Sequence, residues 1–228
     1  MRRFIVLPGM HGTTELLDDF AAAAPRDVQV ELVALPTERL GYSALASHFE
    51  RTLRLTSDSV LIAESFSGPL AIMLAERCEV GALVLCNTFA SAPYPGALRA
   101  LPLSLLDRIP PPAAVVRHFI VGPHASDSLI GEVRAAVASV PAGLLGFRAR
   151  GTLTVDVRPE LARCTAPILY LRGTEDRLVR NRSVRAVIEA ASQPVSVARI
   201  AGPHLLLKTA PSASWRAILE FLARTRAT

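Results

Sequence analysis

The feature that most constrains the fold is an alternation of wholly apolar segments with segments of helical periodicity. Strands that are apolar throughout are buried on both faces, which is typical of a parallel sheet with helices on each side. We therefore expect an α/β fold with a mostly parallel sheet of about six strands. The predicted strands are 2–9, 28–36, 59–65, 82–89, 166–173 and 194–202, and the predicted helices are 14–24, 43–55, 67–78, 181–191 and 211–225.

The alternation stops between residues 90 and 160. This stretch is rich in proline as far as "IPPP" at 109–112, and then shows helical patterns without strands. We interpret 90–160 as a helical lid or cap insertion, and 1–89 together with 161–228 as the α/β core. The apolar stretches "LPLSLLDRI" and "GLLGF" within the insertion are predicted to pack on the core, and lining an acyl pocket is compatible with that role.

Composition narrows the class of protein. A chain of 228 residues suits one domain, and with 50% hydrophobic residues it can bury a core. The start "MRRFIVLPG" resembles a signal peptide, but its apolar part ends at Pro8, and no apolar run is long enough to span a membrane, so we expect a cytoplasmic protein. The net charge of +5 comes from scattered arginines without a basic run, which argues against nucleic-acid binding.

Chemically useful side chains follow the predicted strands. Ligands of open parallel sheets bind outside the carboxyl ends of the strands, and here four strands end in "LPGMHGT", "AESFSG", "RGTEDRLV" and "AGPHLLL". Together these motifs resemble the α/β-hydrolase superfamily, of the small bacterial serine esterase or thioesterase type, over nearly the whole chain. Ser65, Asp176 and His204 occur in the chain order that this family uses. The resemblance implies an α/β-hydrolase fold with a lid after the strand that follows the nucleophile.

The turn around Ser65 departs from the family's G-x-S-x-G pattern. It reads Ala63-Glu64-Ser65-Phe66-Ser67, and small residues still stand two before and two after Ser65, where strand and helix cross closely. A frame centred on Ser67 would put a proline ring at the second of those places. The frame centred on Ser65 instead puts Pro69 in the first turn of the helix, where its missing N–H costs little. Ser65 is therefore the predicted nucleophile.

The resemblance assigns the remaining roles. His204 is the expected base and Asp176 its orienting carboxylate, with Glu175 and Asp156 as weaker candidates for that carboxylate. The backbone N–H groups of Met10 and Phe66 are the expected oxyanion donors. His11 either contacts substrate or hydrogen-bonds backbone, and Glu64 has no firm role.

The sequence thus predicts a serine hydrolase that cleaves a carboxylic ester or thioester with an apolar acyl group, without a cofactor or a metal. Perhydrolases and C–C hydrolases use the same triad. A second hypothesis is an esterase or thioesterase for acyl groups on an acidic acyl-carrier protein, and a third is a non-catalytic hydrolase-fold protein that binds an apolar ligand. The carrier hypothesis rests on arginines in or beside the insertion, namely Arg99, Arg108, Arg117, Arg134, Arg148 and Arg150.

Overall fold

The computed structural model describes residues 2–94 and 111–225. Its centre is a six-stranded sheet in the order β2-β1-β3-β4-β5-β6, and every neighbouring pair is parallel. The predicted parallel α/β sheet is therefore confirmed. The strands are β1 (Arg3–Leu7), β2 (Gln29–Leu32), β3 (Ser59–Glu64), β4 (Ala82–Cys86), β5 (Ile168–Gly173) and β6 (Val195–Ile200).

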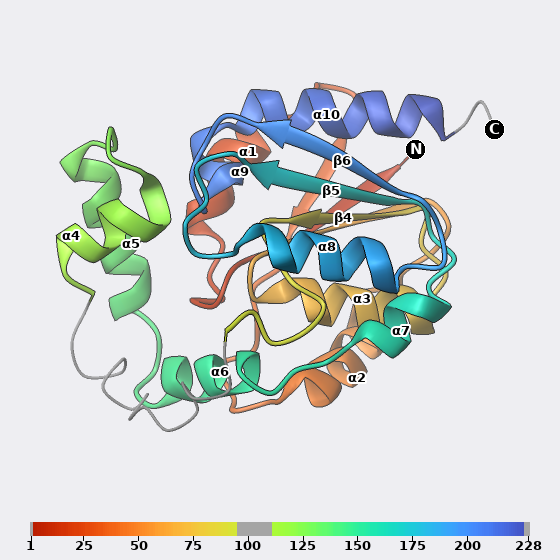
Figure 1. The fold of residues 1–228 in the computed structure, drawn as a ribbon, viewed down its shortest axis with the longest axis horizontal. Helices are drawn as coiled ribbons and strands as arrows, with labels where there is room; N and C mark the ends of the chain where they lie inside the picture. The colour runs from red at the N-terminus through yellow and green to blue at the C-terminus, as the bar shows by residue number, and fades with distance from the viewer. Residues whose placement is uncertain (1, 95–110, 226–228) are drawn as a thin grey trace.

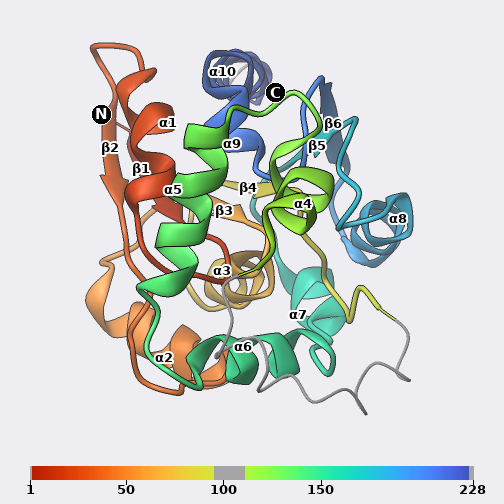
Figure 2. The same ribbon diagram turned by 90° about the vertical axis from the view of Figure 1, so that its left-hand side faces the viewer.

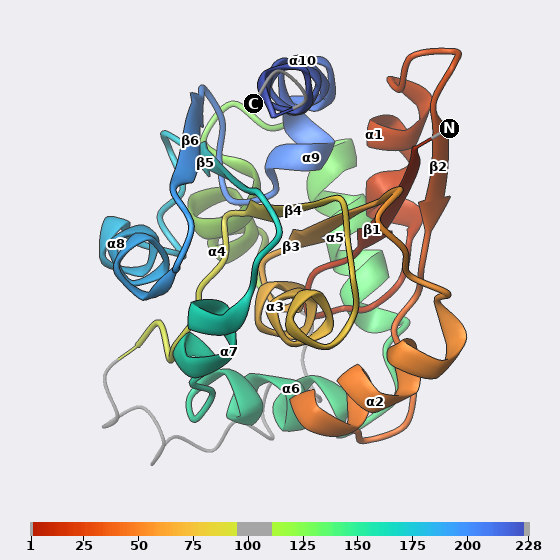
Figure 3. The ribbon, with the colours of Figure 1, turned by 90° about the vertical axis from the view of Figure 1, so that its right-hand side faces the viewer.

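Helices cover both faces of this sheet (Figure 1 and Figure 3). One face carries α2 (Tyr42–Thr52), α3 (Ser67–Arg77), α7 (Arg158–Arg163) and α8 (Asn181–Ala190). The other carries the 3-10 turn η1 (Glu15–Leu17), α1 (Asp18–Ala22), α9 (Leu206–Thr209) and α10 (Pro211–Arg224).

The strands are apolar throughout because each of their two faces meets a helical layer. In β3, Leu61 and Ala63 join the apolar cluster under α3, whereas Val60 and Ile62 join the cluster under α10. All four side chains are fully buried, as the two-residue repeat of a strand between two covered faces requires.

In the connection between β4 and β5, residues 113–138 lie at the carboxyl ends of the strands (Figure 1 and Figure 2). Helices occupy most of its described part from 113 to 163, and an isolated bridge joins Ser91 to Asp156. Val116, Val133 and Leu205 belong to one buried cluster, so the connection packs on the loop that carries His204. The described helices of the connection before α7 are α4 (Ala113–Val116), the π-helical turn η4 (Arg117–Val121), α5 (Asp127–Ala138) and α6 (Leu144–Thr152). The stretch "LPLSLLDRI" at 101–109 lies outside the described residues.

Several predicted boundaries were wrong for physical reasons. The strand predicted at 82–89 ends at Cys86, because Asn87 turns the chain with φ +43°. The helix predicted at 14–24 is divided into η1 and α1, and α9 was not predicted. The division between insertion and core at residue 161 stays a prediction; helix α7 spans this position and packs among the core helices. Within 2–94 and 111–225, no helix has the length and apolar character needed to cross a membrane.

Candidate active site

The turn between β3 and α3 is centred on Ser65. Its φ is +53°, in the left-handed region that non-glycine residues rarely occupy. Such strain persists only where the surroundings hold it. Here the Ser65 N–H donates to Cys86 O over 2.9 Å, and the Thr88 hydroxyl donates to Ser65 O. The turn therefore presents the Ser65 side chain beyond the end of the sheet.

The residues around Ser65 are small enough for strand β3 and helix α3 to cross closely. Ala63 is fully buried in the sheet, and a Cβ added at Gly68 would collide with Thr88. Ser67 is buried as the first residue of α3, and its hydroxyl donates to Pro8 O over 2.5 Å. Ser67 thus joins the start of α3 to the end of β1, and its hydroxyl is engaged away from His204.

Ser65, His204 and Asp176 lie in one hydrogen-bonded line. His204 Nε2 is 2.8 Å from Ser65 Oγ, and His204 Nδ1 is 3.1 Å from Asp176 Oδ1. Both His204 and Asp176 are buried, at 4% and 6% exposure. The three predicted residues therefore meet at the carboxyl ends of β3, β5 and β6, although 139 positions separate the serine from the histidine.

Asp176 is held by several donors. Its Oδ1 accepts hydrogen bonds from the Leu178 and Val179 N–H groups over 2.8 and 3.0 Å, and its Oδ2 accepts one from Arg172 over 3.0 Å. Charge-assisted bonds of this kind fix the carboxylate beneath the imidazole. Arg172 was not identified from the sequence, where it reads as part of an apolar strand.

The two other carboxylates that the sequence left open lie elsewhere. Glu175 is exposed, and Asp156 is exposed and paired with Arg158 over 2.6 Å. Asp176 is the carboxylate that contacts His204.

Asn87, also missed in the sequence, joins the loops that carry the aspartate and the histidine. Its side-chain amide donates to Pro203 O and His204 O over 3.0 and 2.9 Å, and its oxygen accepts from Gly173 N–H over 2.8 Å. The side chain is fully buried. Its position directly after a buried strand was an available signal, because the other site residues follow strands in the same way.

The two expected oxyanion donors flank Ser65. Met10 follows the end of β1, and Phe66 directly follows Ser65. In the described part of the chain, no backbone carbonyl accepts a hydrogen bond from either N–H. Phe66 is held by Tyr42, whose ring stacks on it at 4.8 Å and whose hydroxyl donates to Phe66 O over 3.0 Å.

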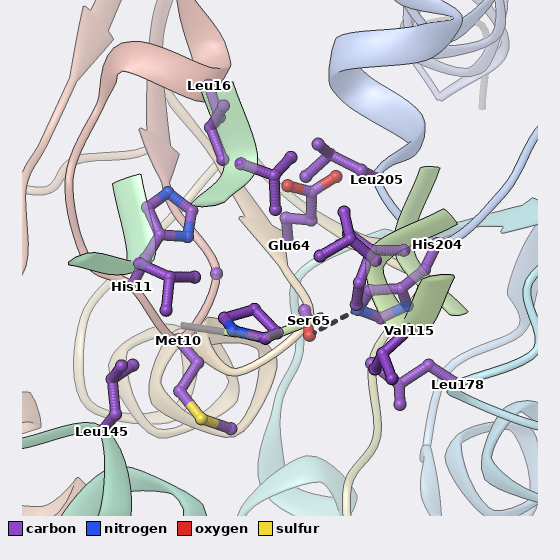
Figure 4. A pocket seen from close by; sticks show the side chains of 16 residues that line it. Met10, His11, Leu16, Glu64, Ser65, Val115, Leu145, Leu178, His204 and Leu205 are labelled. Carbon is purple, nitrogen blue, oxygen red and sulfur yellow. Dashed lines mark hydrogen bonds between the residues drawn. The ribbon is translucent and has the colours of Figure 1, made fainter. Parts of the chain in front are cut away.

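Two apolar cavities meet at Ser65. The larger, of about 270 Å³, lies under α4, η4 and α5. Figure 4 places His11 and His204 on opposite sides of Ser65 in this cavity. The second, of about 220 Å³, is bounded by Phe66, Phe89 and residues of α6. Ser65, Met10 and Leu178 line both cavities. The apolar walls of the larger cavity are Leu16, Val115, Val116, Ile120, Val133, Val137, Leu145 and Leu205.

Two further ionisable groups line the larger cavity. Burial raises the pKa of Glu64 to about 7, although the nearby His204 opposes this. Desolvation lowers the pKa of His11 to about 4, so that its imidazole is neutral at pH 7. Glu64 Oε1 accepts a hydrogen bond from Leu207 N–H over 3.3 Å. Among the described residues, Glu64 Oε2 and His11 Nε2 are buried without a hydrogen-bond partner.

The arginines of the carrier-protein hypothesis are not equivalent in the structure. Arg134 and Arg150 are exposed, and Arg117 pairs with Asp127 over 2.7 Å. Arg148 is buried at 3% exposure and faces the loop after β1, so its inclusion as a carrier contact was wrong. Arg99 and Arg108 lie outside the described residues.

Within the described part of the chain, no group of three or more His, Cys, Asp or Glu side chains could hold a metal ion.

A parallel sheet with a strained serine turn after its third strand is a recognisable arrangement, and we compared it with solved structures. The chain is similar to a hydrolase from Pseudomonas aeruginosa (TM-score 0.81, 20% identity, covering 97% of this chain and 89% of that one). It is also similar to a hydrolase from Oleispira antarctica (TM-score 0.85, 14% identity, 98% and 91% coverage). A third similar structure is an enol-lactonase from Burkholderia xenovorans (TM-score 0.74, 18% identity, 97% and 91% coverage).

The chain therefore has the α/β-hydrolase fold, as the sequence motifs implied. No protein-family model matches the chain, and no curated protein matches its sequence. At identities this low the likeness extends to the fold alone, so the activity has to be argued from the site.

Proposed function

We propose that this protein is a serine hydrolase that cleaves a carboxylic ester or thioester through an acyl-enzyme. The observation that carries the proposal is the hydrogen-bonded line Ser65–His204–Asp176 at the junction of two apolar cavities. A serine bonded to an imidazole, which is itself bonded to a buried carboxylate, is the arrangement that activates a hydroxyl for nucleophilic attack.

In this mechanism Ser65 Oγ attacks the carbonyl carbon while His204 Nε2 takes the hydroxyl proton. The carbonyl oxygen becomes an oxyanion and accepts hydrogen bonds from the N–H groups of Met10 and Phe66. When the tetrahedral intermediate collapses, the alcohol or thiol leaves with the proton from His204. A water molecule, deprotonated by His204, then releases the acid from Ser65. Asp176 holds the Nδ1–H edge of the ring throughout and stabilises the imidazolium.

The two cavities support a substrate with apolar groups on both sides of the bond that is cleaved. We assign the acyl group to the larger cavity, because aliphatic side chains supply most of its wall. Residues 90–160 are the proposed lid, since Val115, Ile120 and Val133 of this segment cover that cavity. An acyl chain of several carbons is favoured over acetate, because each buried methylene contributes about 0.8 kcal/mol.

Two measurements test the proposal. A fluorophosphonate probe should label Ser65 stoichiometrically in the wild-type protein, and labelling should be lost in Ser65→Ala and His204→Ala. A panel of p-nitrophenyl esters and acyl-thioesters of graded length should show kcat/KM rising from acetate to longer chains. Activity that peaks on acetate would contradict the acyl assignment, and a folded wild-type protein that the probe does not label would favour a ligand-binding role instead.

A carrier-bound acyl thioester is the second candidate substrate. The exposed Arg134 and Arg150, together with the net charge of +5, favour an acidic partner. Activity on a carrier-bound substrate should then fall with ionic strength and in Arg134→Ala and Arg150→Ala, while activity on small esters stays unchanged. If carrier-bound and small substrates respond to salt alike, this candidate fails.

A further inference from the structure

Arg148, on α6, is a buried cation bound to main-chain carbonyls. Its Nη1 donates to Met10 O and His11 O over 2.8 and 2.9 Å, and its Nη2 donates to Pro36 O over 2.7 Å. No ion pair within the described residues includes Arg148, although it is only 3% exposed. Desolvation lowers its pKa to about 10, which leaves it charged at neutral pH. Burying a charge costs desolvation free energy, so a buried guanidinium bound to carbonyls suggests a functional role.

The three carbonyls belong to the loops after β1 and β2, and the first of them is that of Met10, a proposed oxyanion donor. Arg148 also reaches the second donor, because its guanidinium carbon lies 6.0 Å from the centre of the Phe66 ring. One side chain therefore contacts both segments that present N–H groups to Ser65. Arg148 lines neither of the two described cavities at Ser65, so it contacts these segments from outside the proposed substrate cavities.

Gly12 makes this approach possible. Its φ is +83°, and a Cβ at this position would overlap Arg148 Nη1. The Gly12 N–H donates to Gly9 O over 3.0 Å, which closes a tight turn around Met10 and His11. The turn thus directs its carbonyls outward to the guanidinium, and a residue with a side chain at position 12 would displace Arg148.

We propose that Arg148 is a positioning residue for the oxyanion hole: by binding the Met10 and His11 carbonyls, it fixes the Met10 N–H in the direction in which it stabilises the oxyanion. The residue acts through the main chain and does not touch the substrate. This inference rests on the proposed serine-hydrolase function and deepens it, since it makes a helix of the β4–β5 connection part of the catalytic framework. Lysine at this position is a poor substitute, because its ammonium group lacks the rigid planar arrangement of N–H donors that a guanidinium has.

The test compares Arg148→Met, Arg148→Lys and Gly12→Ala with the wild type. Arg216→Met, at an exposed position of α10 away from the site, is the matched control. The turnover rate is measured per Ser65 that reacts with the fluorophosphonate probe, so that misfolded protein is not counted. The second readout is the inhibition constant of an apolar trifluoromethyl ketone. Ser65 Oγ bonds to the ketone carbon, the carbonyl oxygen becomes an oxyanion in the hole, and the serine proton moves to His204.

We expect Arg148→Met to lower kcat per labelled site by at least about tenfold while KM stays within about threefold. The affinity for the ketone should fall by a similar factor. Gly12→Ala should change both quantities in the same direction, and Arg148→Lys should fall between Arg148→Met and the wild type. Arg216→Met should match the wild type. A merely structural role would lower the melting temperature and the labelled fraction without changing kcat per labelled site.

Unchanged kcat per labelled site and unchanged ketone affinity in Arg148→Met would overturn the inference, as would a loss confined to KM. If Arg148→Met does not fold, Arg148→Lys and Gly12→Ala decide the question by the same two readouts. A wild-type protein that is neither labelled nor active on esters overturns the proposed function instead, and this inference with it. An active wild type with fully active variants overturns the role of Arg148 alone.

Discussion

Glu64 gives a prediction whose size follows from its burial. Its side chain is 1% exposed, and its pKa is raised from 4.5 to about 7 because burial disfavours the carboxylate. Between these pH values the folded protein keeps a proton that the unfolded chain has released. The free energy of unfolding therefore decreases as the pH rises through this range. A difference of about 2.5 pH units, at about 1.36 kcal/mol each, corresponds to about 3 kcal/mol.

Glu64→Gln removes this titration and keeps an acceptor for the Leu207 N–H. The assay is urea unfolding of wild type and variant at a series of pH values from 4.5 to 8.5. The variant should have nearly the wild-type stability at the acid end and should exceed it by about 3 kcal/mol near pH 8. Because both proteins share all other titrating groups, the difference between the two curves reports the ionisation of Glu64 together with its coupling to His204.

Glu175→Gln is the matched control, since the Glu175 side chain is exposed to solvent in the folded protein. Its stability curve should run parallel to that of the wild type. If the stability difference between wild type and Glu64→Gln is flat across this pH range, Glu64 is ionised in the folded protein and the argument from burial is refuted.

Three other predictions concern the framework of the site. Asn87→Ala leaves three main-chain partners unpaired, so we expect a loss of about 2–4 kcal/mol in urea unfolding; a loss below about 1 kcal/mol would contradict this. Gly68→Ala should cost about 1–3 kcal/mol by overpacking, whereas Gly41→Ala, with open space at its Cβ, should not; equal melting temperatures would refute the overpacking. Ser67→Ala should keep probe labelling at Ser65; if labelling is lost in this variant, Ser67 is the nucleophile instead.

The sequence predicted what depends on local pattern. Apolar strands and helical periods gave the order of the elements, because each strand lies between two helical layers and cannot alternate with polar residues. The predicted ends of elements were wrong where a single residue, or a position at the edge of the sheet, determines where the strand ends. Strand β4 ends early because Asn87 adopts a positive φ, and β2 is short as the edge of the sheet. Neither event changes the hydrophobic pattern from which the bounds were predicted.

The same distinction separates the site residues that were predicted from those that were not. Ser65, Asp176 and His204 each follow a strand, and parallel strands bring their carboxyl ends to one edge, so order along the chain was enough to place them together. Asn87 obeys the same rule and could have been found. Arg148 could not, since its partners lie 138, 137 and 112 positions away and none is distinguished by its side chain. Its contacts are with backbone carbonyls, which every residue carries. Residues that support a site through the main chain of distant loops therefore leave no motif, and they become visible only when the loops are seen together.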